Sequence, residues 1–521
     1  MVSQSESGAV QGDDDGMLPN RVADALAGQV VLVTGATGFM GKVLLEKMLR
    51  SCPGVTTVYL LVRDKKGVSA SQRVLDLFTC PIFDKVKQQN PEVTKKVVGI
   101  PGDVSCPDLG LSEKDRALLC DNVSIVYHAA ATIRFDEALK TAVLLNTRGT
   151  KLILELAKEM KKLKAFVHLS TSYCHLHEKV LYEKTYPPPA DPHEIIECME
   201  TMDDAAACKV TKKILGEIPN SYAFTKALSE ALVAEQIEKM PVIILRPSIV
   251  IPVWREPLPG WTDNINGPTG LLIGAGKGVI RTMHCNQEGY ADYLPVDIAV
   301  NGVLVSTWDF LYNKSDRRVY HLTSSAEIQI SWAEIIERGR RITQRVPLNN
   351  VVWYPGGSMK KSRLAHLICV FFFHFLPAIF IDTLIFLSGH KPIMLRVQRR
   401  INKGFEVFEY YANNQWDFNS DNAQVVRKLM NDRERREFKI DKEGLDIDSY
   451  FEDCIRAARL YILKEMPETL PAARRHMAIM YWVDVVTKTV FYGLLLWYLY
   501  SWTLNLTSFI KRNQGELGHL V

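Results

Sequence analysis

A glycine-rich turn between an apolar run and a helical pattern constrains the fold more than any other feature of the chain. Residues 28–34 (GQVVLVT) form a short apolar run, which predicts a buried parallel strand. The turn GATGFMG follows over residues 35–41, and apolar residues then recur at helical spacing over 43–49. A strand, a tight turn and a helix in this order predict an α/β fold with a parallel sheet.

The same turn predicts a dinucleotide-binding site. Gly35 permits the tight turn, Gly38 lets the backbone approach a pyrophosphate, and Gly41 allows the helix to pack closely on the strand. The helix N-terminus then offers free N–H groups and the positive end of its dipole to the phosphates. A purely structural turn is the alternative, but the flanking strand and helix favour dinucleotide binding.

Strands and helices continue to alternate after this turn, which predicts a doubly wound, Rossmann-like parallel sheet. Helical patterns cover residues 137–160 and 222–239, and loops rich in proline and glycine are expected over 252–278. The further apolar runs expected to be strands are 56–62, 95–100, 123–128, 165–170 and 241–246.

The end of the second strand bears on the choice of cofactor. Arg63 and Asp64 follow this strand. An arginine here favours the 2′-phosphate of NADPH, whereas an acidic residue favours the free ribose hydroxyl of NADH. We predict NADPH, and Asp64 leaves NADH as the alternative.

Two later strand ends offer further cofactor contacts. Asp103 follows the run 95–100, where its carboxylate could meet the adenine amino group; the alternative is a solvated loop aspartate. Ala129 and Ala130 follow the run 123–128, and such small residues would let the cofactor lie against the backbone.

The catalytic signal is a tyrosine–lysine pair. Tyr222 and Lys226 are four residues apart, which places them on one face of a helix. An ammonium beside a phenol favours the phenolate, so we expect a lowered pKa for Tyr222. Such a tyrosine can exchange a proton with a reacting carbonyl oxygen. A chance pair on the surface is the alternative.

Three residues with hydroxyl side chains stand at the end of the run 165–170 and directly after it: Ser170, Thr171 and Ser172. The carboxyl end of a strand is where ligands bind in such sheets, so one hydroxyl could complete an oxyanion-binding set. For at least two of the three, capping of the strand end is the expected role.

These motifs resemble those of the extended short-chain dehydrogenases/reductases. The longer segments that contain them resemble the alcohol-forming fatty acyl-CoA reductases. The likeness covers residues 28 to about 480 and reaches WDFNSDN (416–422) in the second unit. The segments that carry it are VTGATGFMGKVLLEK (33–47), YLLVR (59–63), VYHAAATIRFDE (126–137), LNTRGT (145–150), VHLSTSYC (167–174), NSYAFTK (220–226) and LRPSIV (245–250).

The resemblance implies a role for each matching residue. Tyr222 would be the proton donor and Lys226 its tuner and ribose ligand, with Thr171 as the third member and Ser172 as its alternative. It also implies that NADPH reduces a long-chain acyl-CoA twice, to the alcohol; the residues alone support only carbonyl reduction. The residues expected to contact the cofactor are Gly35, Thr37, Gly38, Phe39, Met40, Gly41, Arg63, Asp103, Val104, Ala129, Ala130, Tyr222, Lys226 and Pro247.

Composition excludes some classes of function. The net charge of +4 and the lack of a basic run with interleaved aromatics give no reason to expect a nucleic-acid partner. None of the ten cysteines forms a C-x-x-C pair, so no metal site is predicted. Lys209, Lys212 and Lys213 are candidates for the CoA phosphates, although a solvated surface is the more usual role of such a cluster. The sequence makes no prediction of oligomeric state.

Two apolar segments predict membrane attachment. Residues 489–510 carry no charge over 22 positions, enough to cross a bilayer core that needs about 20; a buried core helix is the alternative. Residues 364–387 include Pro377 and Asp382, which lipid tolerates poorly, so we expect them at the interface or along an acyl tunnel. The basic stretch 390–484 should stay with the reductase on the cytosolic side, at the endoplasmic reticulum rather than the peroxisome.

The expected organisation therefore has six parts, in which a smaller, mainly helical C-terminal domain and a transmembrane helix follow the reductase domain. Two other functions remain open: a membrane-bound reductase of sterol or other lipid carbonyls, and a regulatory scaffold that binds NADP without turnover. The predicted parts are a disordered N-terminus (1–27), an NADP-binding reductase domain (28–350), a linker with a membrane-associated segment (351–395), a helical domain (396–484), a transmembrane helix (485–510) and a tail (511–521).

Overall fold

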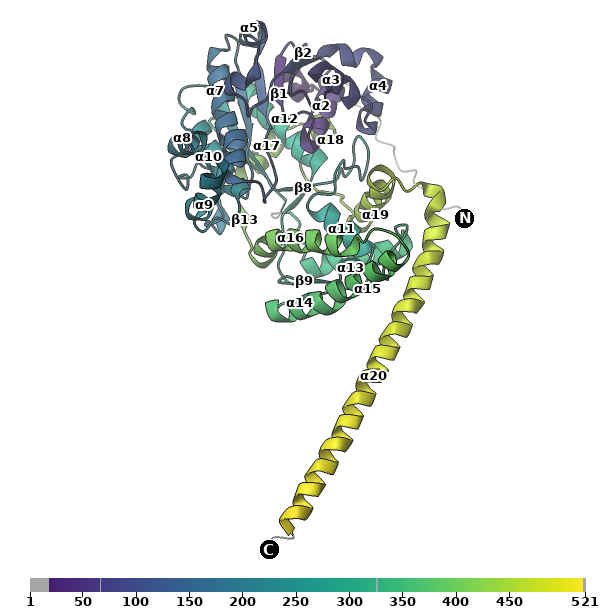
Figure 1. The fold of residues 1–521 in the computed structure, drawn as a ribbon. Helices are drawn as coiled ribbons and strands as arrows, with labels where there is room; N and C mark the ends of the chain where they lie inside the picture. The colour runs from purple at the N-terminus through teal and green to yellow at the C-terminus, as the bar shows by residue number, and fades with distance from the viewer. Residues whose placement is uncertain (1–17, 66, 325–326, 519–521) are drawn as a thin grey trace, which may run out of the picture.

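The computed structural model describes residues 18–65, 67–324 and 327–518, and its centre is a seven-stranded parallel sheet (Figure 1). The strand order is β11-β7-β5-β4-β1-β2-β3, and every neighbouring pair is parallel. This confirms the predicted doubly wound fold. The strands are β1 (Val30–Thr34), β2 (Thr57–Val62), β3 (Val97–Pro101), β4 (Ile125–His128), β5 (Ala165–Leu169), β7 (Val242–Pro247) and β11 (Val319–Leu322).

The strand order reverses at β1, which pairs with β2 on one side and β4 on the other. In open parallel sheets, ligands bind beyond the carboxyl ends of the strands at this reversal. Two apolar layers cover the sheet: α2 (Phe39–Ser51) and α12 (Val296–Tyr312) on one face, α7 (Gly149–Glu159) and α10 (Ser221–Ala234) on the other.

The strands lie close to their predicted positions, but three local expectations were incomplete or wrong. β11 was not predicted. The stretch 252–278, expected to be loop, contains the helix α11 (Pro268–Gly276). The helical stretch 137–160 is helical from residue 139, with a π-helical segment at Val143–Arg148.

The N-terminal expectation was wrong for the residues that the structure describes. Residues 21–26 form α1 (Arg21–Leu26), whose Val22 and Leu26 are fully buried in the core. Arg21 also forms a salt bridge with Glu434, 2.7 Å away. Two apolar side chains at helical spacing were enough to order this segment; residues 1–17 lie outside the described residues.

The C-terminal part is mainly helical, as predicted, but it is interleaved with the sheet domain. β13 (Asp417–Phe418) pairs with β6 (Val180–Leu181), and β12 (Ser358–Lys360) pairs with β9 (Thr282–His284). The boundaries at 350, 395 and 484 therefore stay predictions. The remaining small pair is β8 (Ile249–Ile251) with β10 (Tyr293–Pro295).

A long helix, α20 (Leu470–Gly518), projects away from the body (Figure 1). The other helices of the C-terminal part are α13 (Trp332–Arg345), α14 (Arg363–Val370), a π-helical segment (Phe371–Phe375), α15 (Leu376–Leu387), α16 (Met394–Asn413), α17 (Asp421–Leu429), α18 (Asp432–Glu437) and α19 (Ile447–Ala457) with its π-helical end (Ala458–Ile462). Those of the sheet domain not yet named are α3 (Ala70–Leu77), α4 (Asp84–Gln89), α5 (Glu113–Asn122), α6 (Leu139–Ala142), α8 (Pro192–Thr201) and α9 (Asp204–Leu215). Short 3₁₀ segments are Pro81–Phe83, Pro91–Lys96, Pro107–Gly110 and Pro467–Thr469.

Candidate active site

The first two turns of α10 carry the tyrosine–lysine pair to the carboxyl edge of the sheet. Asn220 caps the helix, because its side-chain oxygen accepts a hydrogen bond from the Ala223 N–H at 2.9 Å. Lys226 lies one turn after Tyr222, and its ammonium donates to the Leu169 carbonyl at the end of β5, 2.6 Å away. Burial lowers the pKa of Lys226 to about 8.

The Tyr222 phenol lies in an aromatic setting that makes it hard to ionise. Its ring stacks on Phe135 at a centroid distance of 5.4 Å, and Phe135 contacts Tyr411 of α16 at 5.5 Å. Burial raises the pKa of Tyr222 to about 12, and a hydrogen bond with Thr171 offsets only part of this. The expected lowering of this pKa was therefore wrong. The phenol stays protonated near pH 7, which is the form that can donate a proton.

The three hydroxyls after β5 have different partners, and only Thr171 is bonded to the phenol. Ser170 donates to the Glu230 carboxylate at 2.8 Å, and Ser172 donates to the Arg246 carbonyl at 2.8 Å. Thr171 lies within hydrogen-bonding reach of Tyr222. This geometry favours Thr171 over Ser172 as the companion of the tyrosine.

The glycine turn has the close approaches that its sequence predicts. Gly35 has a φ of +77°, and a Cβ there would lie 2.7 Å from backbone atoms of Ala129 and Ala130. A Cβ on Gly41 would lie 2.3 Å from the Gly35 carbonyl oxygen. Gly38 is the N-cap of α2 and has no side chain that could accept a hydrogen bond. The first N–H groups of the helix therefore stay available for an anion. The residues therefore fit a dinucleotide pyrophosphate; Thr37, Phe39 and Met40 are partly exposed along the same turn.

The end of β2 carries an exposed cation. The Arg63 side chain is 51% exposed and lies 3.5 Å from the Asp103 carboxylate. Burial opposes the charge of Asp103, but hydrogen bonds from Ser105 hold its pKa below the ordinary value. Asp64 is engaged differently, because its carboxylate accepts the Ala70 N–H at 2.8 Å.

The other two residues of the predicted cofactor set have internal contacts. Val104 is buried and packs against Gly149 so closely that a Cβ added to Gly149 would lie 3.2 Å from the Val104 side chain. Pro247 ends β7, and its carbonyl accepts the Ser172 N–H at 3.0 Å. Lys209, Lys212 and Lys213 are exposed on α9.

Sequence reasoning missed a buried charged network one turn beyond Lys226. The Glu230 carboxylate receives hydrogen bonds from Arg246 Nε at 3.0 Å and from Ser170, and His175 lies 3.1 Å away. Burial disfavours its charge, yet Arg246 and His175 hold the pKa of Glu230 well below its ordinary value. The spacing Tyr-x₃-Lys-x₃-Glu would have placed Glu230 on the same helical face.

The same network bears on metal binding. Cys174, His175 and Glu230 bring possible ligand atoms close together. The Arg246 guanidinium, however, already binds the Glu230 carboxylate and adds a fixed positive charge. The arrangement is that of an ion-pair network, and the absence of a metal site stays a prediction.

An aromatic wall lies on one side of the site, which we define as Tyr173 of the sheet domain with Tyr411, Trp416 and Phe418 of the C-terminal part. Tyr173 contacts the other three edge to face, at centroid distances of 5.8, 5.8 and 5.2 Å. The Tyr411 hydroxyl accepts a hydrogen bond from Asn220 at 2.9 Å, which ties this wall to the start of α10.

Comparisons with known proteins show which family the chain resembles over most of its length. Two family profiles, both described as "Male sterility protein", match residues 33–303 and 373–465. The chain is 39% identical over 451 residues to fatty acyl-CoA reductase 1 of Rattus norvegicus, covering 86% of this chain and 88% of that one. It is 37% identical over 472 residues to fatty acyl-CoA reductase wat of Drosophila melanogaster, covering 90% and 91%.

Solved structures agree on the fold. The reductase domain of a nonribosomal peptide synthetase from Mycobacterium tuberculosis superposes with a TM-score of 0.56 at 18% identity, covering 86% of this chain and 96% of that one. The terminal reductase domain of the myxalamid pathway gives 0.53 at 18% identity, covering 85% and 92%.

The parallel sheet, the glycine turn and the tyrosine–lysine pair define a nicotinamide-dependent reductase of the extended short-chain dehydrogenase type. The extent and identity of the matches to the curated relatives then place it more narrowly: the chain belongs to the fatty acyl-CoA reductase family.

Proposed function

We propose that this protein reduces long-chain fatty acyl-CoA to the primary alcohol, with NADPH as the reductant for both steps. The observation that carries the proposal is the buried Tyr222 phenol, held in its protonated form beside Thr171 at the carboxyl edge of the sheet. The aromatic wall closes one side of this site. Curated relatives named fatty acyl-CoA reductases support the substrate class.

NADPH rather than NADH is proposed from the end of β2. Arg63 is half-exposed, and its side-chain contact with Asp103 is long at 3.5 Å, so it can turn to a 2′-phosphate, a group that arginine binds well. Asp64, which would select the ribose hydroxyl of NADH, has its carboxylate bound to the Ala70 backbone. The lowered pKa of Lys226, about 8, leaves its ammonium charged at neutral pH. A positive charge is what a ribose ligand and partner of Tyr222 needs.

The residues of this chain then polarise and protonate the substrate oxygen. Bound NADPH would supply hydride to the thioester carbonyl carbon. Tyr222 and Thr171 donate hydrogen bonds to the oxygen as negative charge develops there, and Tyr222 passes it a proton. The hemithioacetal collapses to aldehyde and free CoA, and reduction of the aldehyde in the same site gives the alcohol.

Product analysis tests this proposal directly. Purified full-length protein in detergent should convert C16 or C18 acyl-CoA to alcohol with NADPH, releasing one CoA for two NADPH consumed, and should work poorly with NADH. Accumulation of aldehyde alone would contradict the second step. Turnover of a sterol or other lipid carbonyl, but of no acyl-CoA, would contradict the substrate class.

We further propose that the protein is attached to a membrane in two different ways. The segment 363–387 (α14 to α15) turns its polar residues inward: His374 accepts the Arg281 N–H at 2.9 Å, and Asp382 accepts three N–H groups at the start of α16. Its outer face is apolar, the reverse of a soluble surface helix. The exposed apolar residues are Leu364, Leu367, Ile368, Phe371, Phe372, Phe373, Leu376, Ile379, Phe380, Leu384, Phe386 and Leu387.

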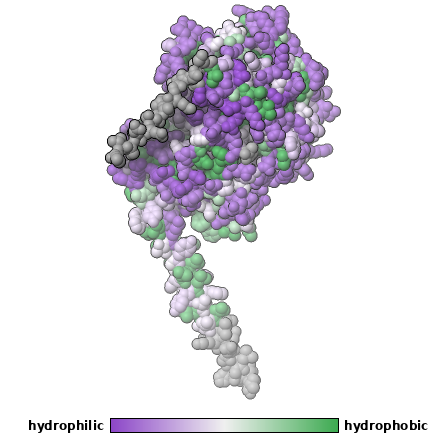
Figure 2. All heavy atoms as spheres, turned by 180° about the vertical axis from the view of Figure 1, so that it is seen from behind, coloured by the Kyte–Doolittle hydropathy of each residue, from purple (hydrophilic) through white to green (hydrophobic). Residues whose placement is uncertain are grey.

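This pattern suits a helix that lies in the membrane interface while its inner face stays on the protein. α20 differs, because it projects from the body (Figure 1). Between residues 489 and 508, apolar side chains are exposed at most positions, and Figure 2 shows green ones among them on one face. Both segments are long and apolar enough to cross a bilayer. We propose that only α20 spans, with the catalytic domain in the cytosol at the endoplasmic reticulum.

Protease protection in sealed microsomes tests the topology. A tag inserted after Gly389, between α15 and α16, should be digested together with the catalytic domain, because both lie on the cytosolic side. A tag after Val521 should be protected. Protection of the tag at Gly389 would show that residues 363–387 span and would defeat the proposal.

A further inference from the structure

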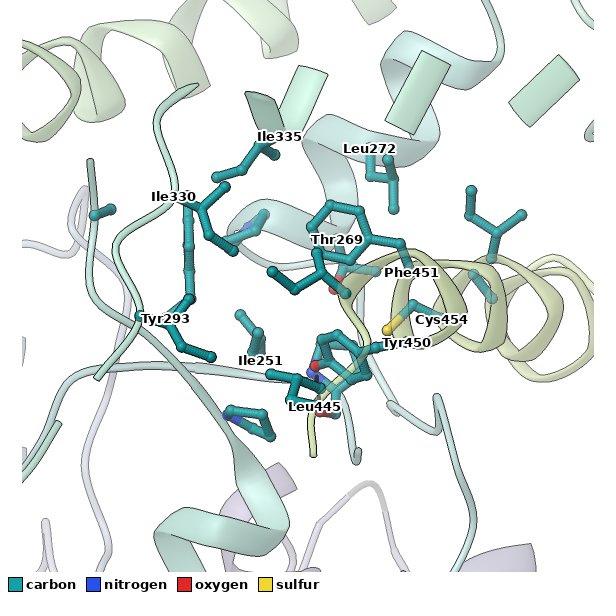
Figure 3. Close-up of a pocket in the computed structure, with 18 of the residues that line it drawn as sticks. Ile251, Thr269, Leu272, Tyr293, Ile330, Ile335, Leu445, Tyr450, Phe451 and Cys454 are labelled. Carbon is teal, nitrogen blue, oxygen red and sulfur yellow. Dashed lines mark hydrogen bonds between the residues drawn. The ribbon is translucent and has the colours of Figure 1, made fainter. Parts of the chain in front are cut away.

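A large apolar cavity lies outside the residues so far assigned to the reaction. It lies between α11, α13 and α19 together with β8 and β10, and the empty space there is about 1080 Å³ when the part open to solvent is counted (Figure 3). Side chains that point into it include Ile251, Leu272, Tyr293, Ile335 and Phe451.

Three of the polar side chains that line this cavity are hydrogen-bonded to the protein itself. The Lys442 ammonium donates to the Tyr293 carbonyl at 2.8 Å, and the Tyr450 hydroxyl donates to the Pro252 carbonyl at 2.6 Å. Ser324 donates to the Asp292 carboxylate at 2.9 Å. A ligand here would therefore find few free polar partners, which favours a long apolar group over a charged or sugar-like one.

One end of the cavity lies close to the candidate active site. Ala291 and Tyr293 line it, and the intervening Asp292 donates its N–H to the Tyr173 hydroxyl at 3.4 Å. Tyr173 belongs to the aromatic wall and follows Thr171 by two residues. Ile251, also in the lining, follows Pro247 by four residues at the carboxyl end of β7.

A second cavity of about 900 Å³ adjoins the first and extends toward the membrane-facing segment. The two share Pro268, Leu272 and Ile335 in their linings. The second is also lined by β9 and β12, and α14 packs against both of these strands. The two apolar cavities are therefore neighbours, one near the aromatic wall and the other near the strands that contact α14.

We propose that the first cavity binds the acyl chain of the substrate and that its depth sets the chain-length preference. This inference rests on the proposed function. The thioester lies at the Tyr222 end, and the chain runs past Tyr293 toward α13 and α19. Residues at the far end, Ala458 and Phe451, then decide how many methylene groups fit.

Two substitutions of opposite sign test the assignment. Ala458→Phe narrows the cavity and Phe451→Ala widens it, so their chain-length optima should move in opposite directions. One methylene group in an apolar pocket changes kcat/KM by about 10–200-fold. We expect Ala458→Phe to lower kcat/KM for the longest chains at least tenfold relative to the shortest, and Phe451→Ala to shift the optimum to longer chains. Arg456→Phe is the matched control, because Arg456 is exposed on α19 outside the lining.

A binding measurement separates this inference from the reaction itself. The fluorescent fatty acid cis-parinaric acid should bind the wild-type protein without cofactor, and Ala458→Phe should weaken this binding at least tenfold while Arg456→Phe leaves it unchanged. Unchanged chain-length profiles in both cavity variants, with alcohol still formed, would overturn the inference and leave the proposed function intact. Parinaric acid binding that depends on Ala458, in a protein that reduces no acyl-CoA, would overturn the proposed function and with it the acyl-CoA occupant.

Discussion

Tyr222→Phe should lower the rate of alcohol formation by about 10²–10⁴-fold, the usual contribution of a general acid. The substitution removes the one phenol that stacks on Phe135 and meets Thr171, and leaves the ring in place. Burial keeps this phenol protonated, so its loss removes the proton that the substrate oxygen receives. The rate is measured by product analysis with saturating NADPH.

Cofactor binding should survive the same change, because the glycine turn and Arg63 are untouched. Tyr410→Phe is the matched control. Tyr410 lies on α16 and its ring packs on Tyr411 and Trp416, but it has no contact with Tyr222 among the ring pairs of the described residues. A Tyr222→Phe protein that keeps more than a tenth of the wild-type rate would remove Tyr222 from its role. Unchanged biological activity of a catalytically dead variant would instead favour the regulatory scaffold.

Glu230→Gln should reduce the free energy of unfolding by about 3–5 kcal/mol, the range for breaking a buried ion pair from one side. Arg246 is fully buried, and the Glu230 side chain is 3% exposed, so neither charge has water to replace its partner. The neutral amide leaves the Arg246 guanidinium and His175 without their shared counter-charge. Against a total stability of about 5–15 kcal/mol, this loss is large. Urea unfolding of the detergent-solubilised protein measures it.

The effect should depend on pH with a defined sign. The folded-state pKa of Glu230 lies below its ordinary value, so its stabilising contribution is present above the unfolded pKa of about 4.3 and is lost as pH falls through the folded value. The two proteins should therefore differ fully at pH 7 and converge in acid. Glu235→Gln is the control, since the Glu235–His193 pair is exposed and is worth about 0–1 kcal/mol. Equal losses in the two variants would contradict the assigned role of burial.

Much of the fold followed from local pattern. The run ending at Thr34, the turn through Gly41 and the helix after it are read from adjacent residues, because strand, turn and helix signals act over a few positions. The tyrosine–lysine pair could be placed for the same reason: a spacing of four fixes a shared helical face. β11 was the strand of the seven-stranded sheet that this approach missed.

The partners of each side chain could not be predicted in the same way. Ser170, Thr171 and Ser172 cannot be told apart by sequence pattern, because all three carry a hydroxyl. Only the packing of α10 and β7 places Thr171 beside Tyr222. The same packing lets Ser170 donate to Glu230 and Ser172 donate to the Arg246 carbonyl. The acyl cavity likewise needs α11, α13 and α19, which are brought together from distant parts of the chain.

The sequence by itself determined the sheet, the dinucleotide turn and the residue types available for catalysis, because these depend on periodicity and short spacings. The protonation state of Tyr222 was decided only by the tertiary structure. The pKa of a group depends on how completely other elements exclude water from it. Here burial, with Phe135 stacked on the ring and Tyr411 behind it, raises the pKa of Tyr222, whereas the four-residue spacing to Lys226 had predicted a lowered value.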